Sequence, residues 1–200
     1  MKILLATGNA HKLKEIMELI NIEGLELLGL DTFDNVPDVE ETGLTFEENA
    51  IIKAREYARF SGMWTLADDS GIEADALNGE PGVYSARYAG VHGADDANNE
   101  KLLREMADKD DRRGRFLCVL ALSSPDGETV DTVSGAVEGV IDHQCTGRNG
   151  FGYDPLFIPL GHELSFGQLD PFIKQRISHR AAACQLASEK WGDFFARPDA

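Results

Sequence analysis

The chain has 200 residues, of which 42% are hydrophobic and 27% charged, a composition typical of a globular protein rather than of a disordered or fibrous chain. Its 35 acidic and 19 basic residues give a formal net charge of −16, and no basic stripe offsets it, so a nucleic-acid polymer is not an expected partner. The longest apolar run, residues 116–122, is far shorter than the roughly 20 residues of a membrane span, so no membrane partner is expected.

The first residues and the cysteines favour an unexported protein. MKILLATGNA has too short an apolar stretch for a signal peptide. Cys118, Cys145 and Cys184 are odd in number, far apart and without the spacing of metal ligands. We therefore expect a cytoplasmic protein with reduced thiols.

The first third of the chain predicts a strand, a loop and two helices. Residues 3–6 are typical of a buried strand, and TGNAHK follows as a loop. Residues 13, 16, 17 and 20 are apolar at helical spacing, and Gly24 is expected to end that helix. A second helix begins at TFEE, where Thr45 and Glu48 predict a capping box, and it stops at Gly62.

The rest of the chain alternates strands, loops and helices. Residues 64–67 predict a strand that ends at ADDSG, and GIEADAL predicts another. NGEPGVYSARYAG is loop-like, and a helix is expected over residues 95–108. RFLCVLALS and ETVDTVSGAVEGVI predict a β-hairpin, followed by the glycine-rich loop TGRNGFGYDP, the short strand LFIP and a closing helix through SHRAAACQLASEKW. This order predicts the α/β class.

Asp68 and Asp69 lie side by side at the expected end of a strand. Adjacent side chains on a strand point to opposite faces, so only one of the two carboxylates can face a given site. Ionised carboxylates are also rarely buried without a partner. A plain turn at the strand end and a functional carboxylate are both compatible with this pair.

Two further segments suit a bound anion. TGNAHK is expected to place free backbone N–H groups and the positive end of a helix dipole at one point, and Lys12 adds a cation there, although an ordinary turn with a solvated lysine is the alternative. On the second helix, Asn49 and Lys53 share a stripe with apolar residues. Either that face borders a polar cleft, or these side chains reach solvent at its edge.

The last third offers groups for a nucleotide base. In GFGYDP, Phe151 or Tyr153 can stack on a base, or it can fill a gap in the core. SHR begins a helix with a serine cap, a histidine and an arginine, as a capped surface helix also does. Cations and carboxylates around one cleft suit a nucleoside triphosphate carried with Mg²⁺. The cations are Lys12, Lys53, Lys174 and Arg180, and the carboxylates are Glu40, Glu41, Asp68 and Asp69.

Five segments, in order from residue 4 to about residue 187, closely resemble the inosine/xanthosine triphosphate pyrophosphatase family: TGNAHK, EETGLTFEENAIIKA, ADDSGIEADALNGEPGVYSARYAG, GFGYDPLF and ISHR. The resemblance implies an α/β fold with an elongated mixed sheet and flanking helices, in which two lobes hold the active cleft between them. It implies one domain over residues 1–200, a homodimer, and Mg²⁺-dependent hydrolysis of ITP, dITP and XTP to the monophosphate and pyrophosphate. The alternatives are a pyrophosphatase for modified pyrimidine triphosphates and a nucleotide-binding protein without turnover.

The resemblance also implies roles for single residues. Asp69 would accept the proton of the attacking water, and a glutamate of the Glu40-Glu41 pair would join Asp69 around the metal. Gln168 and Asn149 depart from the family's usual glutamate and glycine. The implied substrate-binding residues are Thr7, Gly8, Asn9, Ala10, His11, Lys12, Lys53, Ser70, Phe151, Gly152, Tyr153, Asp154, Lys174, His179 and Arg180.

Overall fold

Six strands form one mixed sheet in the computed structural model, which describes residues 1–196, and their order is β2-β1-β3-β4-β5-β6. The strands are β1 (Lys2–Ala6), β2 (Glu26–Gly29), β3 (Thr65–Ala74), β4 (Arg113–Ser123), β5 (Thr129–Ile141) and β6 (Phe157–Pro159). The α-helices are α1 (Ala10–Leu19), α2 (Phe46–Ser61), α3 (Asp95–Glu105), α4 (Pro171–Ile177) and α5 (His179–Phe195). Since β1 pairs parallel with β2 and β3, while β5 and β6 are antiparallel, the mixed α/β class is confirmed.

The chain divides into two compact units, each built from separate stretches of sequence. Unit 1 consists of residues 1–69, 118–135 and 180–200, and unit 2 of residues 70–117 and 136–179. The divisions fall inside β3, β4 and β5 and at the first residue of α5. No helix of residues 1–196 is long and apolar enough to cross a lipid bilayer.

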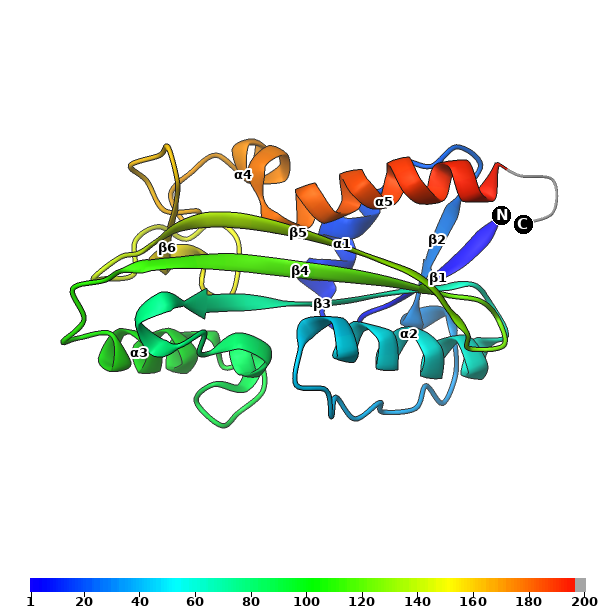
Figure 1. Cartoon of the computed structure of the whole chain (residues 1–200), viewed down its shortest axis with the longest axis horizontal. Coiled ribbons are helices and arrows are strands. Elements are labelled where there is room, and N and C mark those ends of the chain that lie inside the picture. Colours follow the sequence, from blue (N-terminus) through cyan, green and yellow to red (C-terminus); the bar gives the residue numbers. More distant parts are fainter. Residues whose placement is uncertain (197–200) are drawn as a thin grey trace. The chain divides into compact units, whose positions relative to one another are not determined.

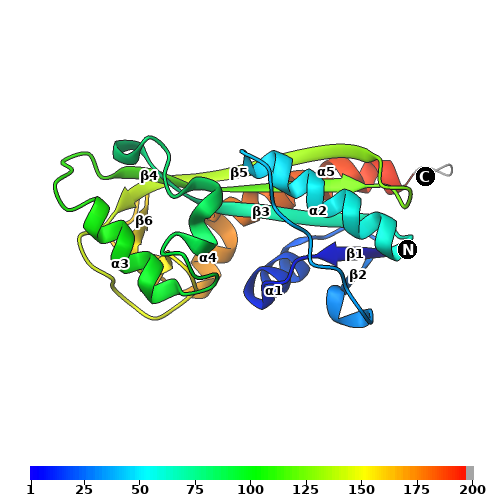
Figure 2. The same ribbon diagram turned by 90° about the horizontal axis from the view of Figure 1, so that it is seen from below.

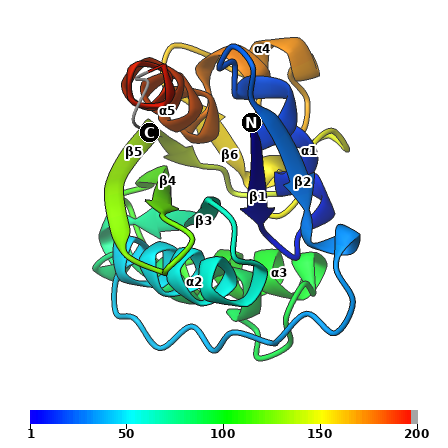
Figure 3. The same ribbon diagram turned by 90° about the vertical axis from the view of Figure 1, so that its right-hand side faces the viewer.

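In unit 1, α1 and α5 cover one face of the strands and α2 covers the other (Figures 1, 2 and 3). The main core lies beneath α1 and α5, where Ile16 and Trp191 pack against Leu66 and Leu120 of the strands. Ile16 belongs to the apolar stripe that predicts α1, whereas Met17 of the same stripe is exposed. The face beneath α2 is lined by small helix residues such as Ala50 and Ala54, so that this helix can approach the sheet closely.

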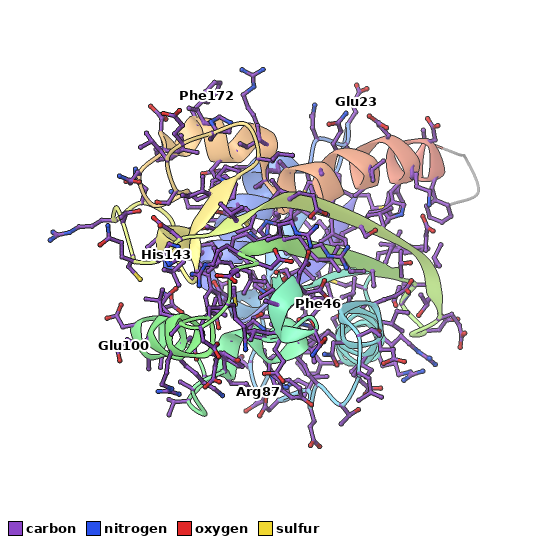
Figure 4. The ribbon with its side chains drawn as sticks, turned by 60° about the vertical axis from the view of Figure 1, so that its left-hand side comes forward. Glu23, Phe46, Arg87, Glu100, His143 and Phe172 are labelled. Carbon is purple, nitrogen blue, oxygen red and sulfur yellow. The ribbon has the colours of Figure 1, made fainter. Side chains whose placement is uncertain are left out.

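Unit 2 has its own aromatic core. The rings of Phe116 and Phe157 are 4.7 Å apart at their centroids, and those of Phe157 and Phe166 are 5.6 Å apart. Leu102 and other residues complete this cluster. Helices α3 and α4 lie on opposite sides of the unit 2 strands (Figures 1 and 3). Phe172, in the first turn of α4, is exposed (Figure 4).

The expectation that a strand ends at ADDSG is wrong, because β3 continues without interruption from Thr65 to Ala74. Gly71 is not a turn residue here. A Cβ atom at this position would lie 2.2 Å from Ser85 Oγ and 2.8 Å from the carbonyl oxygen of Gly82, so the glycine allows a neighbouring segment to approach the strand. The Ser85 hydroxyl also accepts a hydrogen bond from the backbone N–H of Ile72.

Most predicted elements are confirmed. Some of their boundaries differ from the prediction, and two elements of the structure were not predicted. Helix α1 ends at Leu19 rather than near Gly24, and α3 ends at Glu105. Strand β2 was not expected, because its four residues are too few to show alternation. Helix α4 was also missed, although Asp170 caps it and Pro171 occupies its first turn.

The predicted capping box of α2 is confirmed. Thr45 Oγ1 accepts from the Glu48 N–H at 3.1 Å, and Glu48 Oε2 accepts from the Thr45 N–H at 3.2 Å. The same oxygen accepts from the Leu44 N–H at 2.6 Å. The helix ends at Gly62, which has the left-handed conformation of a C-cap.

We expect Thr45→Ala to lower the free energy of unfolding by about 0.5–2 kcal/mol, because the Glu48 N–H loses its acceptor. Urea denaturation followed by circular dichroism measures this change. Thr45→Ser keeps the hydroxyl and is expected to remain close to the wild type. A similar loss in both variants would show that the hydroxyl is not the stabilising group.

Candidate active site

The loop between β1 and α1 is capped by its own side chain. Asn9 Oδ1 accepts from the backbone N–H groups of His11 at 3.0 Å and Lys12 at 3.1 Å, and the Asn9 N–H donates to Thr7 Oγ1 at 3.3 Å. The expectation of free N–H groups at this helix start is therefore wrong for His11 and Lys12. The half-buried Lys12 supplies a cation, and the exposed His11 side chain is a further polar group that this loop offers to an anion.

Strand alternation sends the two adjacent aspartates to opposite faces of β3, and both are buried. On the α1 and α5 side, Asp68 Oδ2 lies 3.2 Å from Lys12 Nζ and 4.0 Å from Arg180 Nη2. Arg180, which is 1% exposed, also forms an ion pair with Glu15 of α1. Burial alone would raise the pKa of Asp68, but the surrounding cations hold that pKa well below its usual range.

Asp69 faces α2 and has a different electrostatic environment. Its Oδ1 lies 3.0 Å from Lys53 Nζ, and its Oδ2 accepts from Asn49 Nδ2 at 3.3 Å. Burial raises the pKa of Asp69, and the opposing effect of the nearby lysines does not cancel that rise. Nearby carboxylates raise the pKa of Lys53, although its burial acts in the opposite direction. Because Lys53 interacts with several carboxylates, its positive charge does not stabilise the ionised form of Asp69 alone.

The structure distinguishes the two glutamates of the Glu40-Glu41 pair. Glu41 is half-buried, and its Oε1 lies 3.1 Å from Lys53 Nζ. Glu40 is exposed. Lys53 therefore contacts both Glu41 and Asp69. Within residues 1–196 there is no group of three or more histidine, cysteine, aspartate or glutamate side chains arranged to hold a metal ion.

In unit 2, a buried ion pair organises the loop at residues 150–155. Asp154 Oδ2 lies 2.6 Å from Lys174 Nζ and accepts from the Phe151 N–H at 2.8 Å. Lys174 Nζ also lies 4.6 Å from the centroid of the half-buried Phe151 ring. The loop is further fixed by α3, since Asp95 Oδ2 accepts from the Gly152 N–H at 2.8 Å.

The candidate base-stacking residues have different environments. Tyr153 is buried, and its hydroxyl donates to the Ser85 carbonyl at 2.8 Å, so its ring belongs to the core. Phe151 is the more accessible of the two. His179 is buried and stacks on Phe116 with centroids 4.8 Å apart. The Ser70 side chain is half-buried.

The two departures from the family pattern have local roles. Asn149 Nδ2 donates to the Leu169 carbonyl at 2.9 Å, and Gln168 Oε1 accepts from the Ser165 N–H at 3.3 Å. Neither contact involves the aspartate pair. The sequence interpretation did not identify Glu15 as a partner of Arg180 or Asp95 as the anchor of Gly152, because these pairs join residues far apart in the chain.

Opposite pKa directions predict effects of different size from two adjacent substitutions on stability. The pKa of folded Asp68 lies below the unfolded value of about 3.9, so its ionised form stabilises the fold above that pH and this contribution is lost as pH falls. Asp68→Asn is expected to lower the free energy of unfolding by about 3–5 kcal/mol near neutral pH. Asp69→Asn is expected to lower it by clearly less, because the raised pKa of Asp69 means that folding disfavours its ionised form, which offsets the loss of one acceptor for Lys53 or Asn49.

Urea denaturation in the presence of a chelator measures both differences. The gap between the wild type and Asp68→Asn is expected to narrow as the pH is lowered below about 4, since Asp68 of the unfolded chain then takes up a proton that the folded chain, with its lowered pKa, takes up only at a lower pH. Equal destabilisation by the two substitutions near neutral pH would contradict the assignment of these environments.

Comparisons with known proteins place the chain in one family. Residues 3–190 match the model of the Ham1 family. A dITP/XTP pyrophosphatase of Rhodopirellula baltica is 49% identical over 186 residues, which cover 92% of this chain and 89% of that protein. One from Oceanobacillus iheyensis is 47% identical over 195 residues, covering 95% and 97%.

Solved structures agree with this result. The Ham1 protein of Staphylococcus aureus has a TM-score of 0.87 and 41% identity, with 97% of this chain and 100% of that chain covered. A nucleoside-triphosphatase / dITP/XTP pyrophosphatase of Mycobacterium abscessus has a TM-score of 0.78 and 43% identity, with 95% and 99% covered. The family predicted from the sequence motifs is confirmed, and the chain belongs to the Ham1 family.

Proposed function

We propose that this chain is a Mg²⁺-dependent nucleoside triphosphate pyrophosphatase that hydrolyses ITP, dITP and XTP to the nucleoside monophosphate and pyrophosphate. The observation that carries the proposal is its membership of a family whose members named dITP/XTP pyrophosphatase are 44–49% identical to it over most of the chain. The buried Asp69, with Lys53 and Glu41 beside it, supplies groups suited to this chemistry.

Formation of a monophosphate and pyrophosphate requires water to cleave the bridge between the α- and β-phosphates by attacking one of these two phosphorus atoms, and a base to accept the water's proton. We assign this role to Asp69. Its carboxylate is held by Lys53 and Asn49, and its raised pKa makes it the more basic of the two aspartates. Asp68 is less suitable, because its cationic neighbours stabilise its ionised form.

The residues around Lys53 fit a divalent cation. Glu41 and Asp69 carry two negative charges beside one ammonium, and carboxylate oxygens are ligands that Mg²⁺ prefers. We propose Glu41, rather than the exposed Glu40, as the glutamate that joins Asp69. When bound, Mg²⁺ neutralises charge on the triphosphate and polarises a phosphoryl oxygen.

Unit 1 is proposed to bind the phosphates. Lys12 has a fixed position beside Asp68, and Lys53 beside Asp69, so both ammonium groups are oriented before any ligand arrives. A locally positive surface is needed because the whole chain carries a formal charge of −16. The remaining unit 1 residues proposed for the phosphate side are Thr7, Gly8, Asn9, Ala10 and His11. Ser70, which is the first residue of unit 2, also stays a predicted phosphate-side residue.

Unit 2 is proposed to recognise the base. Hypoxanthine and xanthine present an oxygen at the purine 6-position, where adenine presents an amino group. The Phe151 and Gly152 N–H groups already donate within the loop, so Lys174 and His179 are the proposed donors to that oxygen, and Phe151 the stacking ring. Gly152, Tyr153 and Asp154 would shape this region, and Arg180 stays a predicted substrate contact.

The cellular setting is part of the proposal. Cys118, Cys145 and Cys184 are free thiols in the structure, as expected in a reducing compartment, and we propose a cytoplasmic location. The homodimer implied by the sequence resemblance also stays a prediction, and sedimentation equilibrium measures it directly.

Pyrophosphate release across a panel of nucleoside triphosphates with Mg²⁺ tests the function. We expect kcat/KM for ITP, dITP and XTP to exceed that for ATP by at least ~100-fold, because an adenine amino group would leave the donors in the base site unpaired. Comparable values for ATP and ITP would refute this account of base recognition. Preference for a modified pyrimidine triphosphate would favour the alternative pyrophosphatase, and no release from any nucleotide would refute the proposed function.

Asp69→Asn tests the proton acceptor. We expect kcat for ITP to fall by roughly 10²–10⁴-fold while nucleotide binding survives, because the amide cannot take up the proton. Single-turnover kinetics and equilibrium binding of ITP in the presence of Ca²⁺ separate the two effects. Near-normal turnover would exclude Asp69 as the base.

A further inference from the structure

Asn49 of α2 is a fully buried polar residue between two segments of unit 1. Its Nδ2 donates to Asp69 Oδ2 at 3.3 Å, and its Oδ1 accepts from the Gly43 N–H at 2.8 Å. The side chain therefore links the proposed base on β3 to the segment that follows Glu41. Neither the sequence resemblance nor the assignments above give Asn49 a role in the reaction.

The orientation of the amide is determined by its partners. A backbone N–H can only donate, so the Asn49 oxygen must face Gly43, and the NH₂ group must then face the carboxylate of Asp69. A carboxylate at this position could accept from Gly43 but could not donate to an ionised Asp69. The amide thus makes both hydrogen bonds at once, which an ionised carboxylate of the same size could not.

The backbone near Gly43 passes very close to the first turn of α2. A Cβ atom at Gly43 would lie 2.6 Å from Asn49 Oδ1 and 2.9 Å from the Asn49 backbone nitrogen. Glu48 Oε2 also accepts from the two N–H groups that follow, those of Leu44 and Thr45. The segment leading from Glu41 into the helix is therefore held at three successive residues.

We propose that Asn49 is a positioning residue for the pyrophosphatase reaction: it orients the Asp69 carboxylate and fixes it relative to the segment that carries Glu41. The inference rests on the proposed function. Asp69 has Lys53 on Oδ1 and Asn49 on Oδ2, so neither oxygen can rotate without breaking a contact. Without Asn49, Lys53 alone would leave the carboxylate free to turn about its own axis.

A purely structural role for Asn49 makes a different prediction. A buried amide with both groups bonded stabilises the core, and its loss would reduce the amount of folded protein without changing each folded molecule. A positioning role lowers kcat per folded molecule instead, because misplacement of a reacting group by about 1 Å can cost ~10²-fold in rate. The two roles are separable by kinetics normalised to the folded fraction.

The experiment compares Asn49→Asp, Asn49→Ala and a matched control, Asn98→Ala. Asn49→Asp keeps the side-chain volume and the acceptor for Gly43 but loses the donor to Asp69. Asn98, on α3 in unit 2, is also buried, and its amide accepts from the backbone N–H of Ala89 and donates to the backbone carbonyl of Ala86. Each variant is assayed for ITP hydrolysis and for its urea unfolding curve.

We expect kcat per folded molecule to fall at least ~10-fold in both Asn49 variants, with KM for ITP within about threefold of the wild type. Asn98→Ala is expected to lose stability but to keep kcat within about twofold. Normal kcat in folded Asn49→Asp beside an active wild type would overturn this inference and leave the proposed function intact. An inactive wild type would overturn both.

Discussion

The arrangement of the candidate site depends on one constraint: two adjacent carboxylates on a single strand must each find a cation on a different face. Alternation along β3 sends Asp68 toward α1 and α5 and Asp69 toward α2. A buried carboxylate without a cation is costly, so each helix must present a lysine at the matching height. Lys12, from α1, and Lys53, from α2, meet this requirement. The positions of both helices on the sheet are thereby tied to the aspartate pair.

The two environments give chemically identical side chains different properties. Asp68 has cations from two helices and behaves as a permanent counter-ion for Lys12. Asp69 shares its single ammonium with Glu41 and keeps a raised pKa. In the proposed reaction the first aspartate orients a phosphate-binding lysine, while the second is left basic enough to accept a proton.

Local signals in the sequence predicted much of the fold. The capping box at Thr45 and the stop at Gly62 predicted the limits of α2, because both depend on residues within one turn of the helix end. Other features of the fold depend on packing between residues far apart in the sequence and could not be predicted from local signals. Gly71 is of a residue type common in turns, but in the structure its missing side chain allows Ser85 to approach β3 closely. Ser85 lies fourteen positions later, in a segment that is loop-like in sequence.

The candidate site shows the same contrast between what local sequence predicts and what depends on contacts between distant residues. Residue types and their order pointed to Lys12, Lys53, Asp69 and the Glu40-Glu41 pair, but not to which glutamate reaches Lys53, since that depends on how the segment before α2 is anchored. The Asn49 amide and the missing Cβ of Gly43 provide that anchor. A polar residue on the apolar stripe of a helix was the visible sign of this contact, although its partners lie six and twenty residues away. Where a buried stripe carries an amide, both ends of that amide must be satisfied, and tracing them leads from the helix to the strand and loop that it holds together.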